Sequence, residues 1–160
     1  MAANWWFVCR HLKPGYGWME QVEFDWYPRC DDGSLPSDCA LLQWYSLLCQ
    51  ATEGAYKPIA YNTSTRQQLQ SAGFTEVAEQ IIRIPLNSWP KDKQEHDIGQ
   101  WCLLGLDLYL EALTLGPFTR VLGWGKQRVD KLLSEVRRDL RTKRFHAYCE
   151  LHVWTGRRAG

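Results

Sequence analysis

The sequence predicts an α/β fold with about three strands and a largely helical insertion. Three segments alternate apolar and polar residues with a period of two, which is typical of strands. Other segments repeat their apolar residues at helical spacing. The expected strands cover residues 17–26, 75–86 and 146–155, and the insertion covers 96–143. Three strands form a small sheet for a chain of 160 residues with this much apolar sequence.

The first strand follows a turn that ends a helix over residues 4–12. Pro14 presets φ for a turn and Gly15 tolerates positive φ, so the helix stops there. A strand that begins this early, directly after a helix end, suggests a fold entered in its middle.

Helices of about 38–52 and 65–72 separate the first two strands, and the remaining helices lie in the insertion. The helix expected over 96–115 carries Trp101 and Tyr109 on one face and further leucines elsewhere, so we expect it to be covered on more than one side. Gly116 and Pro117 are expected to end it. An amphipathic helix follows over 126–143.

Composition excludes several classes of function. A net charge of +1 gives no general attraction to nucleic acid or to an acidic membrane. Asp107 and Glu111 interrupt the most apolar helix, so we expect no membrane span. The six cysteines form no C-x-x-C pair and offer no four-ligand zinc set, which favours free thiols and no metal. The N-terminus lacks a secretory leader, so we expect a cytoplasmic protein, with the nucleus as the alternative.

Several stretches, in this order and with these gaps, resemble the class I S-adenosylmethionine-dependent methyltransferases. They are similar to the fungal group that includes the velvet-complex regulator of secondary metabolism. The stretches are His11–Glu20, Asp31–Pro36, Ala72–Val77, Trp89–Lys93, Phe118–Trp124 and His146–Arg158.

The resemblance implies that residues 1–160 form one truncated methyltransferase-like domain, with a helical cap over about 89–143. It places strand 17–26 as the fifth of a seven-stranded sheet. The last strand would then lie between the other two and antiparallel to them. The implied function is methyl transfer from S-adenosylmethionine to a small molecule of a fungal secondary-metabolite cluster. No family cofactor-binding residue matches a position here, because Gly15-Tyr16-Gly17 precedes a strand and Gly123-Trp124-Gly125 lies between helices.

Candidate site residues lie at the first strand and at the start of the apolar helix. Paired carboxylates can raise one pKa and so provide a general base, whereas a carboxylate facing solvent does no chemistry. A histidine and an aspartate at a helix start either line a pocket or cap the helix. The candidates for catalysis are Glu20, Glu23 and His96, and those for substrate binding are Trp18, Asp25 and Trp101.

Three interpretations of function remain open at this point. The first is a methyltransferase without its cofactor-binding half, so that no S-adenosylmethionine binds this chain in the family manner. The second is a non-catalytic accessory protein that forms a homodimer or binds a protein partner through the exposed edge of strand 17–26. The third is a repurposed, cofactor-free enzyme of cyclisation or isomerisation that acts on a natural product.

Overall fold

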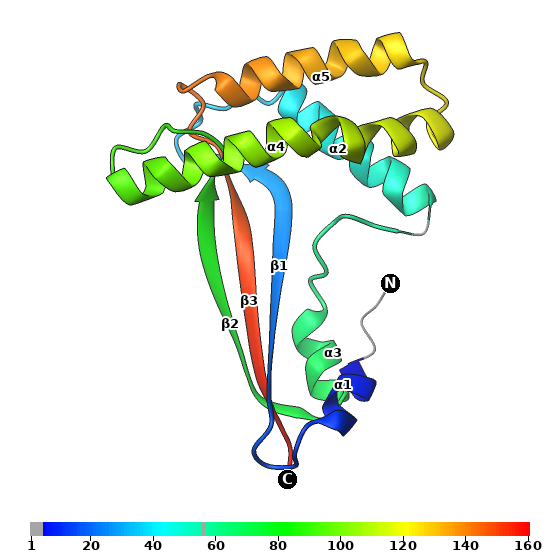
Figure 1. The fold of residues 1–160 in the computed structure, drawn as a ribbon, viewed down its shortest axis with the longest axis vertical. Coiled ribbons are helices and arrows are strands. Elements are labelled where there is room, and N and C mark those ends of the chain that lie inside the picture. Colours follow the sequence, from blue (N-terminus) through cyan, green and yellow to red (C-terminus); the bar gives the residue numbers. More distant parts are fainter. Residues whose placement is uncertain (1–4, 56) are drawn as a thin grey trace. The chain divides into compact units, whose positions relative to one another are not determined.

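One three-stranded sheet contains all the strands among the described residues, which are 5–55 and 57–160 of this computed structural model. The strands are β1 (Trp18–Arg29), β2 (Phe74–Pro85) and β3 (Tyr148–Arg158), in the order β1-β3-β2. β3 runs opposite to both neighbours (Figure 1). The predicted α/β class is confirmed, and so is the expected position of the last strand.

The strands differ from the prediction mainly at their ends. β1 continues to Arg29 and β3 to Arg158, past the predicted ends at 26 and 155. The backbone N–H of Arg158 donates to the carbonyl of Gly17 at 2.8 Å, which extends the pairing. β3 begins at Tyr148 and not at 146, because the backbone N–H of His146 donates to a side chain, Ser34 Oγ, at 2.8 Å.

The chain divides into two compact units, each with its own stretch of the three strands. Unit 1 comprises the described residues of 1–25, 61–82 and 151–160, and it holds the short helices α1 (Trp5–His11) and α3 (Thr65–Ser71). The helix expected over 4–12 is observed from Trp5, and residue 4 lies outside the described part. Gly15 adopts φ 71° in the turn before β1, as the sequence predicts. The buried core of unit 1 consists of Cys9, Met19, Leu69, Phe74 and Trp154.

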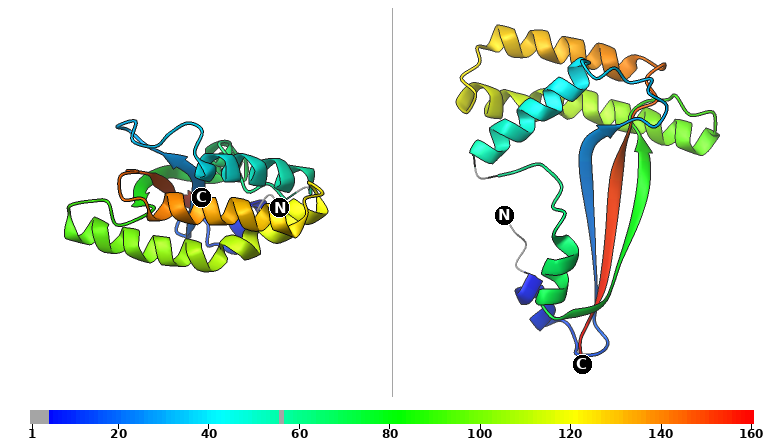
Figure 2. Two further views of the ribbon diagram at one scale, coloured as in Figure 1. Left: turned by 90° about the horizontal axis from the view of Figure 1, so that it is seen from above. Right: turned by 180° about the vertical axis from the view of Figure 1, so that it is seen from behind.

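Unit 2 comprises the described residues of 26–60 and 83–150 and contains the three longer helices. These are α2 (Ala40–Gly54), α4 (Lys93–Arg120) and α5 (Lys126–Arg141), which pack against one another in pairs (Figure 2). The indole N–H of Trp44 in α2 donates to Thr114 Oγ1 in α4 at 2.8 Å, so a buried donor is satisfied across two helices.

The predicted helix break at Gly116 and Pro117 is wrong, because α4 continues to Arg120. Thr114 and Phe118 lie one turn apart on α4 and are both fully buried. Their packing keeps this turn helical although proline donates no hydrogen bond, and the N–H of Val121 still donates to the carbonyl of Pro117 at 3.0 Å.

The expectation that α4 is covered on more than one side is also wrong. Leu106 and Leu110 are buried, whereas Trp101 and Tyr109 are 73% and 66% exposed. The helix is apolar around most of its circumference, so its period alone could not identify the buried side. Among the described residues, α4 is the one helix with the length and composition of a membrane span. One such helix is weak evidence of a span, and 22% of its apolar window is buried.

We expect that only glycine fits at position 99, where α4 crosses the segment after β2. A Cβ on Gly99 would lie 2.1 Å from the carbonyl oxygen of Asn87. We expect Gly99→Ala to lower the free energy of unfolding by about 3 kcal/mol, because backbone atoms have to move apart. Urea denaturation would measure it. Gly105→Ala in the same helix is the matched control, since its Cβ would meet nothing. In dilute solution, Gly105→Ala should raise the free energy of unfolding by about 0.5–1 kcal/mol. Equal effects of the two substitutions would contradict the close contact.

Candidate functional site

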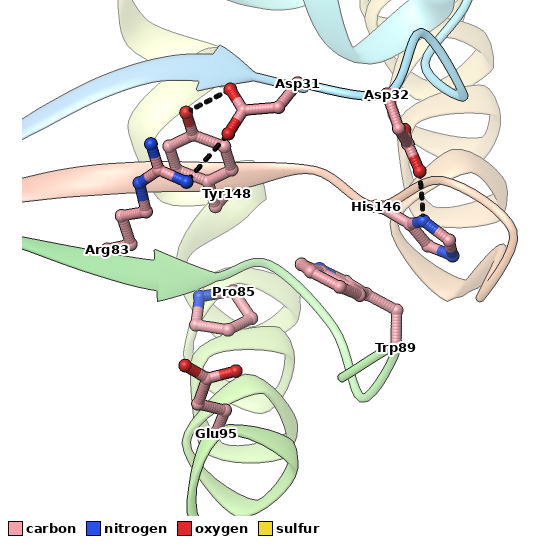
Figure 3. Close-up of a pocket in the computed structure, with 8 residues that line it drawn as sticks. All are labelled: Asp31, Asp32, Arg83, Pro85, Trp89, Glu95, His146 and Tyr148. Atoms are coloured by element: carbon pink, nitrogen blue, oxygen red, sulfur yellow. Dashed lines mark hydrogen bonds and ion pairs between the residues drawn. The ribbon is translucent and has the colours of Figure 1, made fainter. Parts of the chain in front are cut away.

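A hollow of about 240 Å³ in unit 2 collects polar and aromatic side chains from five segments (Figure 3). The segments are the loop after β1, the end of β2, the loop that follows it, the first turn of α4 and the start of β3. Sites of α/β proteins gather at such carboxyl ends of strands. The lining residues are Asp31, Asp32, Arg83, Pro85, Trp89, Glu95, His146 and Tyr148.

Asp31 joins two of the strands at one wall of the hollow. Its carboxylate accepts a hydrogen bond from Tyr148 Oη at 2.7 Å and pairs with Arg83 Nη1 at 2.7 Å. The Arg83 guanidinium also lies over the Tyr148 ring, 4.7 Å from its centroid. The hydrogen bond from Tyr148, with Arg83 nearby, lowers the pKa of Asp31. Burial and the same hydrogen bond raise the pKa of Tyr148.

Asp32 orients His146 at the other wall. Asp32 Oδ2 lies 2.5 Å from His146 Nδ1. Asp32 Oδ1 accepts hydrogen bonds from the Cys30 thiol at 3.1 Å and from the backbone N–H of Ser34 at 3.0 Å. These donors, with Cys30 the largest contributor, hold the pKa of Asp32 well below its usual range. The ionised carboxylate only accepts, so His146 donates through Nδ1.

The His146 ring is also held from one face. Trp89 stacks on it with the ring centroids 4.7 Å apart and the planes inclined by 26°. The Trp89 indole N–H donates to the carbonyl of Ala147 at 3.1 Å, which fixes the indole in turn. In the neutral ring, Nε2 is therefore a positioned hydrogen-bond acceptor. A fixed histidine whose other nitrogen is held by a carboxylate can accept a proton from a ligand.

The candidate residues on β1 lie in unit 1 and point to opposite faces of the strand. Trp18 and Glu20 are exposed, whereas Asp25 is 6% exposed and Glu23 is partly buried. Glu20 and Glu23 therefore do not form a pair. Burial raises the pKa of Glu23, and the neighbouring Asp25 carboxylate raises it further while His152 opposes the shift.

The candidates at the start of the apolar helix are not brought together either. α4 begins at Lys93 behind Asp92, whose side chain accepts the N–H of Glu95 at 3.0 Å, so Asp92 is the cap. His96 Nδ1 lies 3.5 Å from its neighbour Asp97, and Trp101 points outward. Neither His96 nor Trp101 lines the hollow.

A second polar network, in unit 1, is partly buried. Glu79 accepts a hydrogen bond from Tyr61 Oη at 3.0 Å and lies 2.7 Å from His152 Nδ1. The Tyr61 ring stacks on His152, and the Trp154 indole N–H donates to Tyr61 Oη at 3.1 Å. Burial, together with Glu79, raises the pKa of Tyr61. The network ties β2 to β3 on one face of the sheet.

The described residues do not fit S-adenosylmethionine in the manner of the class I family. That manner requires a glycine-rich turn between a strand and a helix, which lets the ligand approach the backbone. The connection from β1 to α2 holds Gly33, which Ser34-Leu35-Pro36 follow, and its Asp31 and Asp32 are engaged with protein partners. The connection from β2 to α4, residues 86–92, holds no glycine.

The residues of the hollow were not among the site residues predicted from the sequence. Three of the stretches that carry the family resemblance meet there: Asp31–Pro36, Trp89–Lys93 and the start of His146–Arg158. These stretches were therefore recognised in the sequence as motifs, but no role in a site was assigned to them. Arg83 and Glu95 lie outside those stretches, and only the fold brings them in.

Asp32→Asn should lower stability at neutral pH. The native-state pKa of Asp32 is depressed, so its contribution exists above the unfolded-state pKa and disappears as the pH falls through the native value. Urea denaturation at several pH values should show the wild type above the variant near pH 7 and the two converging at strongly acidic pH. Asp38→Asn, an exposed aspartate of the same connection, is the control and should change little. A difference that persists undiminished in acid would contradict the assignment.

Glu23→Gln should raise stability at neutral pH, in contrast to Asp32→Asn. The native-state pKa of Glu23 is raised, so its ionisation opposes folding as the pH rises through the interval above its usual value. The variant should be more stable than the wild type at pH 7 and equal to it near pH 3. Glu20→Gln on the exposed face of β1 is the matched control. Lower stability of Glu23→Gln at pH 7 would refute the effect of burial.

Comparison with known proteins gives close relatives, although no family model matches the chain. The secondary metabolism regulator LAE1 of Cochliobolus heterostrophus is 51% identical over 94% of this chain and 50% of its own length. The secondary metabolism regulator laeA of Monascus pilosus is 45% identical over 94% of this chain and 41% of its own length. The protein-methionine methyltransferase laeA of Emericella nidulans is 43% identical over 94% of this chain and 40% of its own length.

The chain spans about half or less of the length of these relatives. The identities are far above the level at which similarity could be accidental, and they extend over nearly all of this chain. Nearly the whole of this chain is therefore homologous to part of the LAE1 and laeA proteins, which are named regulators of secondary metabolism and, in one case, a protein-methionine methyltransferase.

Proposed function

We propose that this chain acts within a methyltransferase-like regulator of fungal secondary metabolism. The observation that carries the proposal is the strand order β1-β3-β2 with an antiparallel central strand, in a chain homologous to such regulators. We infer that the sheet is the C-terminal half of a class I, Rossmann-like methyltransferase sheet. Membership of a biosynthetic cluster and a place in the cytoplasm or nucleus belong to the same proposal.

In this proposal the chain supplies the side of the site that holds the methyl acceptor. The hollow at the carboxyl ends of β1 and β2 offers apolar walls, Trp89 and Tyr148, beside a positioned acceptor atom, His146 Nε2. These features suit an acceptor with an apolar body and a polar group. S-adenosylmethionine would be bound by the part of the relatives that this chain does not span. The acceptor is either a natural product, as the resemblance implies, or a protein side chain, as the name of one relative indicates.

The accessory role remains the second candidate because β1 is an edge strand. In the order β1-β3-β2 only one side of β1 is paired within the sheet, and Trp18 and Val22 are 53% and 54% exposed. An edge of this kind can accept a strand from another chain. The repurposed cofactor-free enzyme has the weaker support, because its candidate carboxylates, Glu20 and Glu23, lie on opposite faces.

Calorimetric titration of the purified chain with S-adenosylmethionine tests where the cofactor binds. We expect no heat of binding, because the described strand-to-helix connections do not fit the cofactor. Binding in the micromolar range would contradict this division of roles.

Deletion of the gene in its host tests the regulatory function. We expect the profile of secondary metabolites to change, and re-expression of the wild-type gene to restore it. Tyr148→Ala in the hollow should fail to restore the profile, whereas Glu135→Gln, at a partly exposed position of α5 outside the hollow, should restore it. An unchanged profile after deletion would refute the regulatory role. Full restoration by Tyr148→Ala, checked for expression, would refute a role for the hollow.

A further inference from the structure

α4 presents a continuous apolar face to solvent in unit 2. Trp101, Leu108 and Tyr109 are 73%, 70% and 66% exposed, and Leu104 and Ile98 extend the same face. Monomeric soluble proteins rarely expose so many large apolar side chains together. An exposed apolar face of this kind is typical of a site of association.

Gly105 lies in the middle of that face, and none of the described residues crowds it. A Cβ on Gly105 would meet no atom within 4 Å, in contrast to Gly99 on the buried side. Glycine inside a helix lowers stability relative to alanine, and Gly105, like Gly116 in the same helix, has no packing contact that would require glycine. A glycine on a helix surface does have a use where a second helix approaches closely.

Two aromatic residues of the face flank Gly105 symmetrically. Trp101 and Tyr109 lie one turn before and one turn after it, in the same i±4 row. A second α4 that crosses antiparallel at Gly105 would place Trp101 of each copy against Tyr109 of the other, with the two glycines at the axis. This reciprocal contact is what a two-fold symmetric interface demands.

The area available also suits a second copy. With aromatic and leucine side chains of roughly 150–250 Å² each, the exposed fractions amount to roughly 600 Å² per copy. A standard stable interface buries about 800 Å² per partner, so the exposed area of the face is about three quarters of that size.

We propose that this protein forms a two-fold symmetric homodimer through α4, with the helices crossing at Gly105. The proposal is independent of the methyltransferase-like function and of the edge of β1. The interface is formed by Ile98, Trp101, Leu104, Gly105, Leu108 and Tyr109.

Sedimentation velocity of the full chain, over submicromolar to high micromolar concentrations, tests the proposal. We expect a monomer–dimer equilibrium in the wild type. Leu108→Gln should raise the dissociation constant by about tenfold or more, because it removes an apolar contact from the proposed interface without changing the core of the monomer. Ile81→Gln on β2, with an exposed fraction of 51%, is the matched control and should leave the equilibrium unchanged. A wild-type monomer at all concentrations would overturn the proposal.

Gly105→Leu distinguishes a close helix crossing at Gly105 from nonspecific association of the apolar face. It makes the face more apolar, and its Cβ would meet no described atom within 4 Å, but its side chain would block the axis of the crossing. We expect it to weaken the dimer by about tenfold or more. Stronger association of this variant would overturn the crossing at Gly105. A dimer that dissociates with Val22→Lys on β1 and not with Leu108→Gln would assign association to the edge strand instead. Circular dichroism verifies that each variant is folded.

Discussion

The pairing of β3 with both β1 and β2 is the constraint on which the described structure depends. In unit 1 the N–H groups of Arg158 and Ala159 donate to the carbonyls of Gly17 and Gly73. In unit 2 the N–H of Leu86 donates to the carbonyl of Ala147 at 3.0 Å. Each bond joins segments far apart in the sequence, so the entropy of closing long loops has to be overcome before any strand is fully paired. Neither β1 nor β2 pairs with the other, and both depend on β3.

The hollow follows directly from that pairing. β3 begins between the ends of its two neighbours, so His146 and Tyr148 reach the aspartates after β1 on one side and the β2 segment on the other. The charges are arranged in pairs, with Asp31 against Arg83 and Asp32 against His146. The bonds that tie the strand ends together therefore also position the polar groups that a ligand would meet.

The sequence predicted those parts of the fold in which the local pattern and the tertiary packing agree. Period-two alternation located all three strands, and the one-sided apolar pattern of α5 located that helix. The prediction failed where packing overrides the local signal, as at Pro117, where buried Thr114 and Phe118 keep α4 helical. The hollow could not be predicted as a site, because Arg83 and Glu95 carry no motif and meet the others only through strand order.

The outward direction of the apolar face of α4 is fixed by contacts on its other sides. Asp107 pairs with Arg137 at 2.9 Å and with Arg141 at 2.7 Å, which ties one flank of α4 to α5. Gly99 packs against the backbone of Asn87, where no larger residue fits. A rotation of α4 that buried Trp101 would break the ion pairs and bring a side chain into that backbone contact. The exposure of the face therefore follows from the packing of unit 2, and the proposed dimer would remove its apolar area from water.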